Sequence, residues 1–289
     1  MPSNNPGEVV YNNEYKLSVG WRQAYAEVLH DVYQYRALIW QYVRRDFVAS
    51  YRGSRLGFLW KIILPLVPMS VYVLLQLAGV FTAEVGMPRA LYVVCGMTFW
   101  TVWSDTLAAS LDCLSVQSTM IKKVKVPLVV VYVISTAPIL FDTLVRIVLV
   151  VSLLLVYGQP FQWTWLLVPL MAVPFLVFGV GLGILFSFFA VFTKDVKNLV
   201  LIVVRYGLYC SAVIFPLPAA GVLGRVLAWN PLYQLVEGTR SLLVQGSLVH
   251  PGSLVHPIVY VVCIAGTVAV CLLSLKKTAS MEERLVWAL

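Results

Sequence analysis

Long apolar segments constrain the fold of this chain more than any other feature of its sequence. A helix that crosses a lipid bilayer needs about 20 consecutive, mostly apolar residues, and six segments come close to or exceed that length. Hydrophobic residues make up 60% of the whole chain, above the roughly 45–50% that is usual in soluble domains. We therefore predict an all-α integral membrane protein with six transmembrane helices. The predicted helices are residues 62–81, 90–111, 129–156, 164–192, 199–217 and 258–275.

The distribution of cations between the apolar segments predicts their orientation. Cytoplasmic loops of membrane proteins carry an excess of lysine and arginine. The loops after the second and fourth segments and the carboxyl end carry this excess, and the other loops do not. The first sixty residues also lack the early apolar core of a signal peptide. We therefore predict a multi-pass protein with both termini in the cytoplasm. The cations are Lys122, Lys123, Lys125, Lys194, Lys197, Lys276, Lys277 and Arg284.

Residues 21–47 precede the first apolar segment and repeat hydrophobic side chains at helical spacing. The pattern predicts an amphipathic helix that lies on the cytoplasmic membrane surface, where aromatic rings suit the interface. A helix packed on a soluble subdomain remains the alternative. The hydrophobic stripe is Trp21, Tyr25, Val28, Val32, Tyr35, Ile39 and Tyr42.

Residues 218–247 are apolar, but Gly221, Gly224 and the Asn230–Pro231 step interrupt them. We predict two short helices that dip into the outer leaflet and return, with a plain external loop as the alternative. The chain then divides into a cytoplasmic segment with the amphipathic helix, a six-helix transmembrane domain with a re-entrant external segment, and a cytoplasmic tail. These parts are residues 1–60, 61–277, 218–252 and 278–289.

Several kinds of catalytic chemistry have no motif in this sequence. There is no GxxxxGK[ST] phosphate loop, and no glycine is followed by a lysine anywhere in the chain. The five cysteines show no CxxC spacing, and no cluster of His, Cys, Asp and Glu has the spacing of metal ligands. We therefore predict a transport subunit without its own ATPase site, which is not an enzyme and binds no metal or cofactor itself.

Charged residues inside the apolar segments are the candidate functional residues, because each costs at least about 2.5–3.5 kcal/mol at the membrane centre. Asp142 and Arg146 are four positions apart, so they share a helix face and could neutralise each other. Asp105 lies in the second segment. Pairing across helices as a structural contact is one interpretation, and a water-filled lumen that suits a sugar chain is the other. The candidate lining residues are Asp142, Arg146, Arg205, Tyr206 and Tyr209.

The stretch "RRDFVASYRGSRLGFLWKIILPL" resembles the entrance motif of type 2 ABC exporter membrane subunits that export bacterial polysaccharides. Four further stretches resemble later parts of that family in the same order along the chain: "GMTFW", "IKKVKVP", "GVGLGILFSFFAVFTKDVKNL" and "NPLYQLVEGTRSLLVQG". Two positions depart from the family pattern. Thr193 and Lys194 precede Asp195 where an aromatic residue and an arginine are usual, and Val126 replaces a usual phenylalanine.

The resemblance implies a homodimer in the bacterial cytoplasmic (inner) membrane, with a channel at the subunit interface. It implies two copies of a separate ATP-binding subunit that hold ATP and Mg, and a lipid-linked polysaccharide substrate of the O-antigen, teichoic acid or capsule type. No nucleic acid is expected as a partner. The alternatives are a type 2 ABC exporter of small amphiphiles or drugs, and a channel or carrier outside this family.

The resemblance also assigns candidate roles to individual residues. Arg52 and Arg55 would receive lipid phosphate at the entrance, and the alternative explanation of their charge is topology and contact with anionic lipid headgroups. The candidate entrance residues are Arg44, Arg45, Arg52 and Arg55. The candidate ATPase-coupling residues are Lys122, Lys123, Lys125, Pro127, Lys194 and Asp195. The candidate external gate residues are Asn230, Pro231, Glu237 and Arg240.

Overall fold

The computed structural model describes residues 21–49, 56–57, 59–80, 87–123, 126–211, 213–215, 222–246 and 255–288. The regular structure in these ranges is helical throughout, as the sequence predicts. The helices are α2 (Trp21–Gln34), α3 (Arg36–Ala49), α4 (Leu59–Leu77), α5 (Arg89–Val116), α6 (Ser118–Lys123), α7 (Leu128–Val156), η1 (Trp163–Leu167), α8 (Val168–Ala190), α9 (Lys194–Gly207), η2 (Leu208–Ser211), α10 (Val222–Leu227), α11 (Pro231–Gln245) and α12 (Pro257–Ala288).

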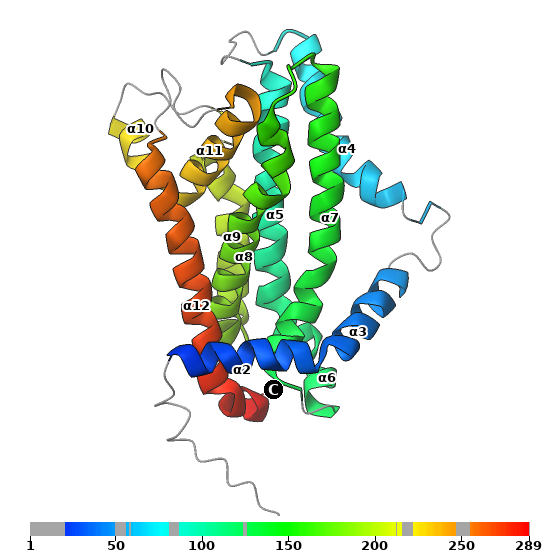
Figure 1. The fold of residues 1–289 in the computed structure, drawn as a ribbon, viewed down its shortest axis with the longest axis vertical. Helices are drawn as coiled ribbons and strands as arrows, with labels where there is room; N and C mark the ends of the chain where they lie inside the picture. Colours follow the sequence, from blue (N-terminus) through cyan, green and yellow to red (C-terminus); the bar gives the residue numbers. More distant parts are fainter. Residues whose placement is uncertain are drawn as a thin grey trace, which may run out of the picture.

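Four long helices, α5, α7, α8 and α12, stand side by side and form the main bundle (Figure 1). The closest packing joins α8 to α5 on one side and to α12 on the other. Glycines of α8 permit this approach, because a Cβ at Gly179 would lie 2.8 Å from the carbonyl oxygen of Trp103 in α5. A Cβ at Gly181 would lie 2.9 Å from the Cα of Cys271 in α12. The "GVGLG" stretch therefore sets the contact of three helices.

Four helical stretches are long and apolar enough to cross a membrane: Leu59–Leu77, Leu128–Val156, Trp163–Ala190 and Pro257–Thr278. They confirm four of the six predicted spans. The second predicted span lies within α5, which has 28 residues but is less apolar. The fifth is shorter than predicted, because α9 has 14 residues and ends at Gly207, where a 3₁₀ turn begins. A helix of that length reaches about 21 Å, less than the roughly 30 Å of a hydrocarbon core.

The predicted amphipathic helix at 21–47 is divided into α2 and α3 by a turn at Tyr35. Figure 1 shows α2 lying across one end of the bundle, at a large angle to the long helices. The hydrophobic stripe is used for packing, since Tyr35, Ile39 and Tyr42 lie against the buried cluster formed by the ends of α5, α6 and α7. The stripe therefore packs on the helix bundle itself.

The interrupted apolar region contains two short helices, α10 and α11, as predicted. In α11, eleven of its 15 residues are buried. Near the carboxyl end of α11, the Leu243 carbonyl accepts a hydrogen bond from Trp165 Nε1 at 2.7 Å. The Val244 carbonyl accepts one from Gln162 Nε2 at 2.8 Å. The segment after α7 thus holds α11 against the bundle.

Candidate functional site

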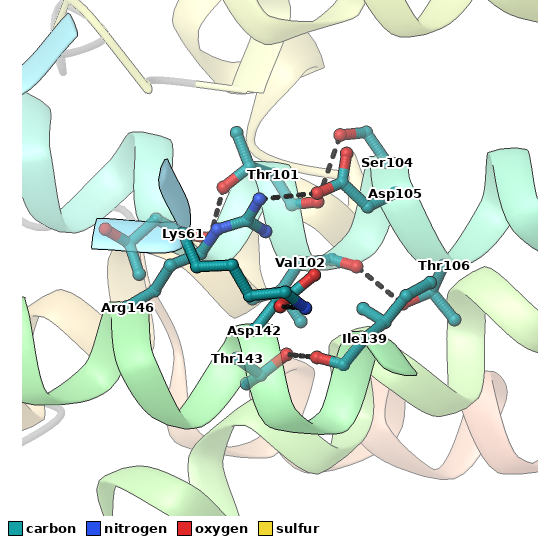
Figure 2. A network of polar contacts seen from close by, with 11 residues as sticks. Lys61, Thr101, Val102, Ser104, Asp105, Thr106, Ile139, Asp142, Thr143 and Arg146 are labelled. Carbon is teal, nitrogen blue, oxygen red and sulfur yellow. Dashed lines mark hydrogen bonds and ion pairs between the residues drawn. The ribbon is translucent and has the colours of Figure 1, made fainter. Parts of the chain in front are cut away.

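Four charged residues from three helices form two neighbouring ion pairs (Figure 2). Lys61 of α4 pairs with Asp142 of α7, and Arg146 of α7 donates from Nη2 to Asp105 Oδ2 of α5 at 2.6 Å. We call Lys61, Asp105, Asp142 and Arg146 the central network. Its formal charges sum to zero, which lowers the cost of placing them among apolar helices.

The sequence prediction that Asp142 and Arg146 neutralise each other differs from this arrangement. Each of them pairs with a residue of another helix. Pairing across helices is therefore present for Asp105, Asp142 and Arg146, and a water-filled lumen beside them stays a prediction. Lys61 could not be assigned to Asp142 from the sequence, because 81 positions separate the two residues. Lys61 lies in the basic entrance motif, and nothing in that motif indicates which residue of another helix it pairs with.

A cavity of about 160 Å³ lies next to the central network, between α4, α5 and α7. Its wall is mostly apolar, with Pro65 and Tyr72 from α4, Met97 and Thr101 from α5, and Arg146 from α7. The Nη1 atom of Arg146 is buried and has no hydrogen-bond partner among the described residues. The guanidinium group therefore neutralises Asp105 with one nitrogen and leaves a second donor available beside the cavity.

The ends of α3 and α4 meet the same point of α7. The rings of Phe47 and Phe141 are in edge contact with centroids 5.3 Å apart, and Lys61 Nζ lies 5.5 Å and 5.3 Å from these two centroids. Of the entrance residues, Arg44 and Arg45 are exposed on α3, and Arg45 pairs with Asp46 at 2.8 Å. Arg52 and Arg55 lie outside the described residues.

Three other candidate lining residues occupy a different surface. Arg205, Tyr206 and Tyr209 lie on α9 and η2, and all three are exposed in the single chain. The structure does not bring them to Asp142 and Arg146 in the central network. The five lining residues proposed from sequence thus fall into two groups on different helices.

The candidate coupling residues lie around the ends of α6, α7 and α9. Pro127 precedes the first residue of α7, and Lys194 and Asp195 are exposed in the first turn of α9. The side chains of Lys122 and Lys123 and the whole of Lys125 lie outside the described residues.

Lys197 makes an ion pair with α5 that the sequence did not predict. Its Nζ lies 2.8 Å from the carboxylate of Asp112 in α5. Asp112 was assigned to a loop, whereas α5 continues to Val116.

A second cluster of charge surrounds Arg240 of α11, which is fully buried. Arg240 pairs with Glu237 one turn earlier, and its Cζ lies 3.5 Å from the ring centroid of Tyr92. Its Nη2 donates to the carbonyl of Val213 at 3.5 Å, and the Tyr92 hydroxyl donates to Glu237 Oε2 at 3.3 Å. We call Tyr92, Val213, Glu237 and Arg240 the Arg240 cluster.

Glycines shape the surroundings of the Arg240 cluster. A Cβ at Gly96 of α5 would collide with Arg240 Nη2 and would lie 2.8 Å from the Val213 carbonyl oxygen. A Cβ at Gly238 would lie 2.5 Å from ring carbons of Tyr260 in α12. Gly96 opens the "GMTFW" stretch, so this motif provides the space that a buried guanidinium group needs.

The start of α11 is fixed by Asn230. Its Oδ1 accepts from the backbone of Leu232 at 3.0 Å, which caps the helix, and Pro231 occupies the first helical position. Its Nδ2 donates to Ser211 Oγ of η2 at 3.0 Å. The four candidate gate residues therefore hold α11 in place in this structure.

Comparison with known proteins identifies relatives over most of the chain. The family model described as "ABC-2 type transporter" matches residues 37–244. The O-antigen export system permease protein RfbA of Myxococcus xanthus is 27% identical over 228 residues, which cover 76% of this chain and 85% of that protein. Two proteins of the same name from Klebsiella pneumoniae are 26% and 25% identical, each covering 71% of this chain and 79% of the relative. The family match contains both the central network and the Arg240 cluster.

Proposed function

Because the chain belongs to the ABC-2 type transporter family, we propose that it is the membrane-spanning subunit of an exporter of lipid-linked polysaccharide. The exporter moves a glycan of the O-antigen, teichoic acid or capsule type across the bacterial cytoplasmic membrane. The observation that carries this proposal is the similarity to three O-antigen export permeases over most of the chain. The family match runs from α3 to α11 and so includes the helices of the central network.

The energy for transport comes from a separate ATP-binding subunit, which the family implies. The sequence has no phosphate loop of its own. We propose two copies of that partner, each holding ATP and Mg. Helices α2 and α6 lie at the same end of the bundle as the carboxyl terminus (Figure 1) and would offer the contact surface. The cation excess predicts that this end faces the cytoplasm.

Two copies of this chain would form the channel. Along its described length, α4 has no buried residue in the single chain, and it exposes Leu64, Val67 and Leu74. α9 likewise exposes Leu199 and Ile202. Exposed apolar helices fit both lipid and a second copy, and a homodimer would place them around a shared path.

The candidate entrance residues retain their proposed role. Arg44 and Arg45 are exposed cations in the second half of α3, where an anionic lipid phosphate of the cargo would reach them. Replacing Arg52 and Arg55 with alanine should lower export while assembly with the ATP-binding subunit survives. Loss of assembly would instead assign these arginines to structure or orientation.

Deletion of the gene followed by cell fractionation tests the proposed function. Lipid-linked glycan should accumulate in the cytoplasmic membrane, the surface glycan should be lost, and a plasmid copy should restore it. Unchanged surface glycan would overturn the proposal. Sensitivity to amphiphilic compounds, measured in the same strains, would then point to an exporter of small amphiphiles.

A further inference from the structure

Helix α9 is attached to α5 at two points, one near each end. Lys197 pairs with Asp112 at 2.8 Å, and a Cβ at Gly207 would lie 3.2 Å from Trp100 Cη2. The α9 contacts are ten positions apart and the α5 contacts twelve positions apart, which correspond to about 15 Å and 18 Å of helix. The two helices therefore run antiparallel along this length. α9, described along its whole length, has Val200 as its single buried residue.

The two attachments of α9 differ in strength. At the Gly207 end, the buried Ser211 hydroxyl donates to the Gly207 carbonyl at 3.0 Å and accepts from Asn230 at 3.0 Å. At the other end, the side chains of Lys197 and Asp112 are 43% and 32% exposed. Half-exposed ion pairs break and form again at low cost. The Gly207 end is thus held by buried hydrogen bonds, whereas the Lys197 end is held to α5 by a reversible ion pair and to α8 by the short turn before Lys194.

Asp112 belongs to a part of α5 that packs together with α6. The backbone continues across the turn at Gln117, whose N–H donates to Cys113 and whose carbonyl accepts from Ile121 at 3.0 Å. Met120 and Ile121 of α6 are buried in one cluster with Cys113 and Leu114 of α5. Because side chains of α6 and α5 fill the same core, a displacement of α6 carries the last turns of α5 with it.

We propose that the Asp112–Lys197 ion pair passes movement of α6 to α9. A partner that shifts α6 would move Asp112, and the ion pair would carry Lys197 and the first turns of α9 with it, together with the turn that joins α9 to α8, while the Gly207 end stays in place. This inference rests on the proposed function, in which α6 contacts the ATP-binding subunit. Asp112 and Lys197 are then positioning residues for transport.

Charge variants in the intact complex test this link. In membrane vesicles that contain the ATP-binding partner, Asp112→Asn or Lys197→Gln should lower glycan export by at least about fivefold, the lower end of ordinary coupling between sites. ATP hydrolysis and co-purification with the partner should stay unchanged. The exchange Asp112→Lys with Lys197→Asp should restore export, because it restores the pair.

Asn198→Gln is the matched control, since Asn198 is exposed beside Lys197 on α9 and its side chain makes no hydrogen bond with any described residue. Its export should equal that of the unmodified protein. Equal losses for Asn198→Gln and Lys197→Gln would overturn the proposal, and so would failure of the exchange to restore export. A parallel fall of hydrolysis and export would show a purely structural role and would also overturn it.

A cysteine pair tests the same link without any cargo. Asp112→Cys and Lys197→Cys are combined in a chain whose other cysteines are replaced, and disulfide yield is measured in the complex without nucleotide and after trapping with ATP and vanadate. The two yields should differ. Equal yields, including the absence of any disulfide, would overturn the link. Because no glycan enters this measurement, its result is independent of whether the proposed cargo is correct.

Discussion

The Arg240 cluster and the central network both place charge among apolar helices, but they enclose it differently. The side chains of Arg240 and Glu237 are 1% and 18% exposed, and both belong to α11. In the central network, Arg146 and Asp105 are 17% and 46% exposed and belong to α7 and α5. One pair is sealed within a single helix and its neighbours, and the other joins separate helices beside a cavity.

The two clusters therefore have different structural roles: the Arg240 cluster fixes the position of α11, and the central network depends on how three helices are placed. Both residues of the Arg240–Glu237 pair belong to α11, so the pair stays intact if α11 moves. Its contacts with Gly96 and Tyr92 of α5 are possible at only one position of α11. Moving α11 would leave a buried charge without that enclosure, at a cost of several kcal/mol. The central network instead depends on the relative positions of α4, α5 and α7. A shift of one of these helices would change which charged residues of the network pair with each other, while each residue stays on its own helix.

The largest effect is expected for Arg240→Gln. The substitution leaves the largely buried Glu237 without its cation, and breaking a buried pair costs about 3–5 kcal/mol. The yield of folded protein in detergent and the midpoint of thermal unfolding measure the loss. Arg205→Gln removes an exposed cation and should leave both values unchanged. Equal stability of the two variants would contradict the view that the Arg240 cluster is sealed.

Gly96→Ala should have the next largest effect, because the added methyl group occupies space used by the Arg240 guanidinium group and by Val213. Overpacking of this kind costs about 1–3 kcal/mol. Gly266→Ala is the control, since nothing lies within 4 Å of a Cβ at that position of α12. Thermal unfolding should show destabilisation for Gly96→Ala, and no loss or a slight gain for Gly266→Ala. A stable Gly96→Ala protein would show that the cluster has room to adjust.

A smaller effect is expected for the Arg146–Asp105 pair. Its partly exposed carboxylate limits the loss, and polar contacts between membrane helices couple by about 1 kcal/mol. A double-mutant cycle with Arg146→Gln and Asp105→Asn measures this coupling by thermal unfolding. Export should fall more than stability does, because Arg146 faces the cavity. Coupling as strong as that between Arg240 and Glu237 would remove the distinction between the two clusters.

The sequence predicted the elements of this fold better than their contacts. Apolar length located four spanning helices, and the spacing of Tyr35, Ile39 and Tyr42 located a packed helix face. The break at Tyr35 has no proline or glycine to announce it. The length of α9 was overestimated, because apolar composition continues beyond Gly207 where the α-helix ends.

The sequence identifies candidate site residues but does not identify their partners. Charges such as Asp142 and Arg146 are rare in apolar segments, so they attract attention wherever they occur. Their pairing with Lys61 and Asp105 depends on the register between helices. That register is set by close contacts such as those at Gly179 and Gly181, which become visible only when the helices are packed.

The smallest effect is expected for Arg45–Asp46, the most exposed pair of the series, with side chains that are 59% and 34% exposed. Water screens such a pair, and surface pairs contribute about 0–1 kcal/mol. Arg45→Gln should therefore leave thermal unfolding nearly unchanged at both low and high salt. Arg45→Gln should also lower export if Arg45 receives lipid phosphate, and that effect should weaken as salt screens the charge. A stability loss equal to that of Arg146→Gln would mean that enclosure does not set the strength of these pairs. In that case the order from Arg240 through Arg146 to Arg45 would need another cause, such as the number of helices that each pair connects.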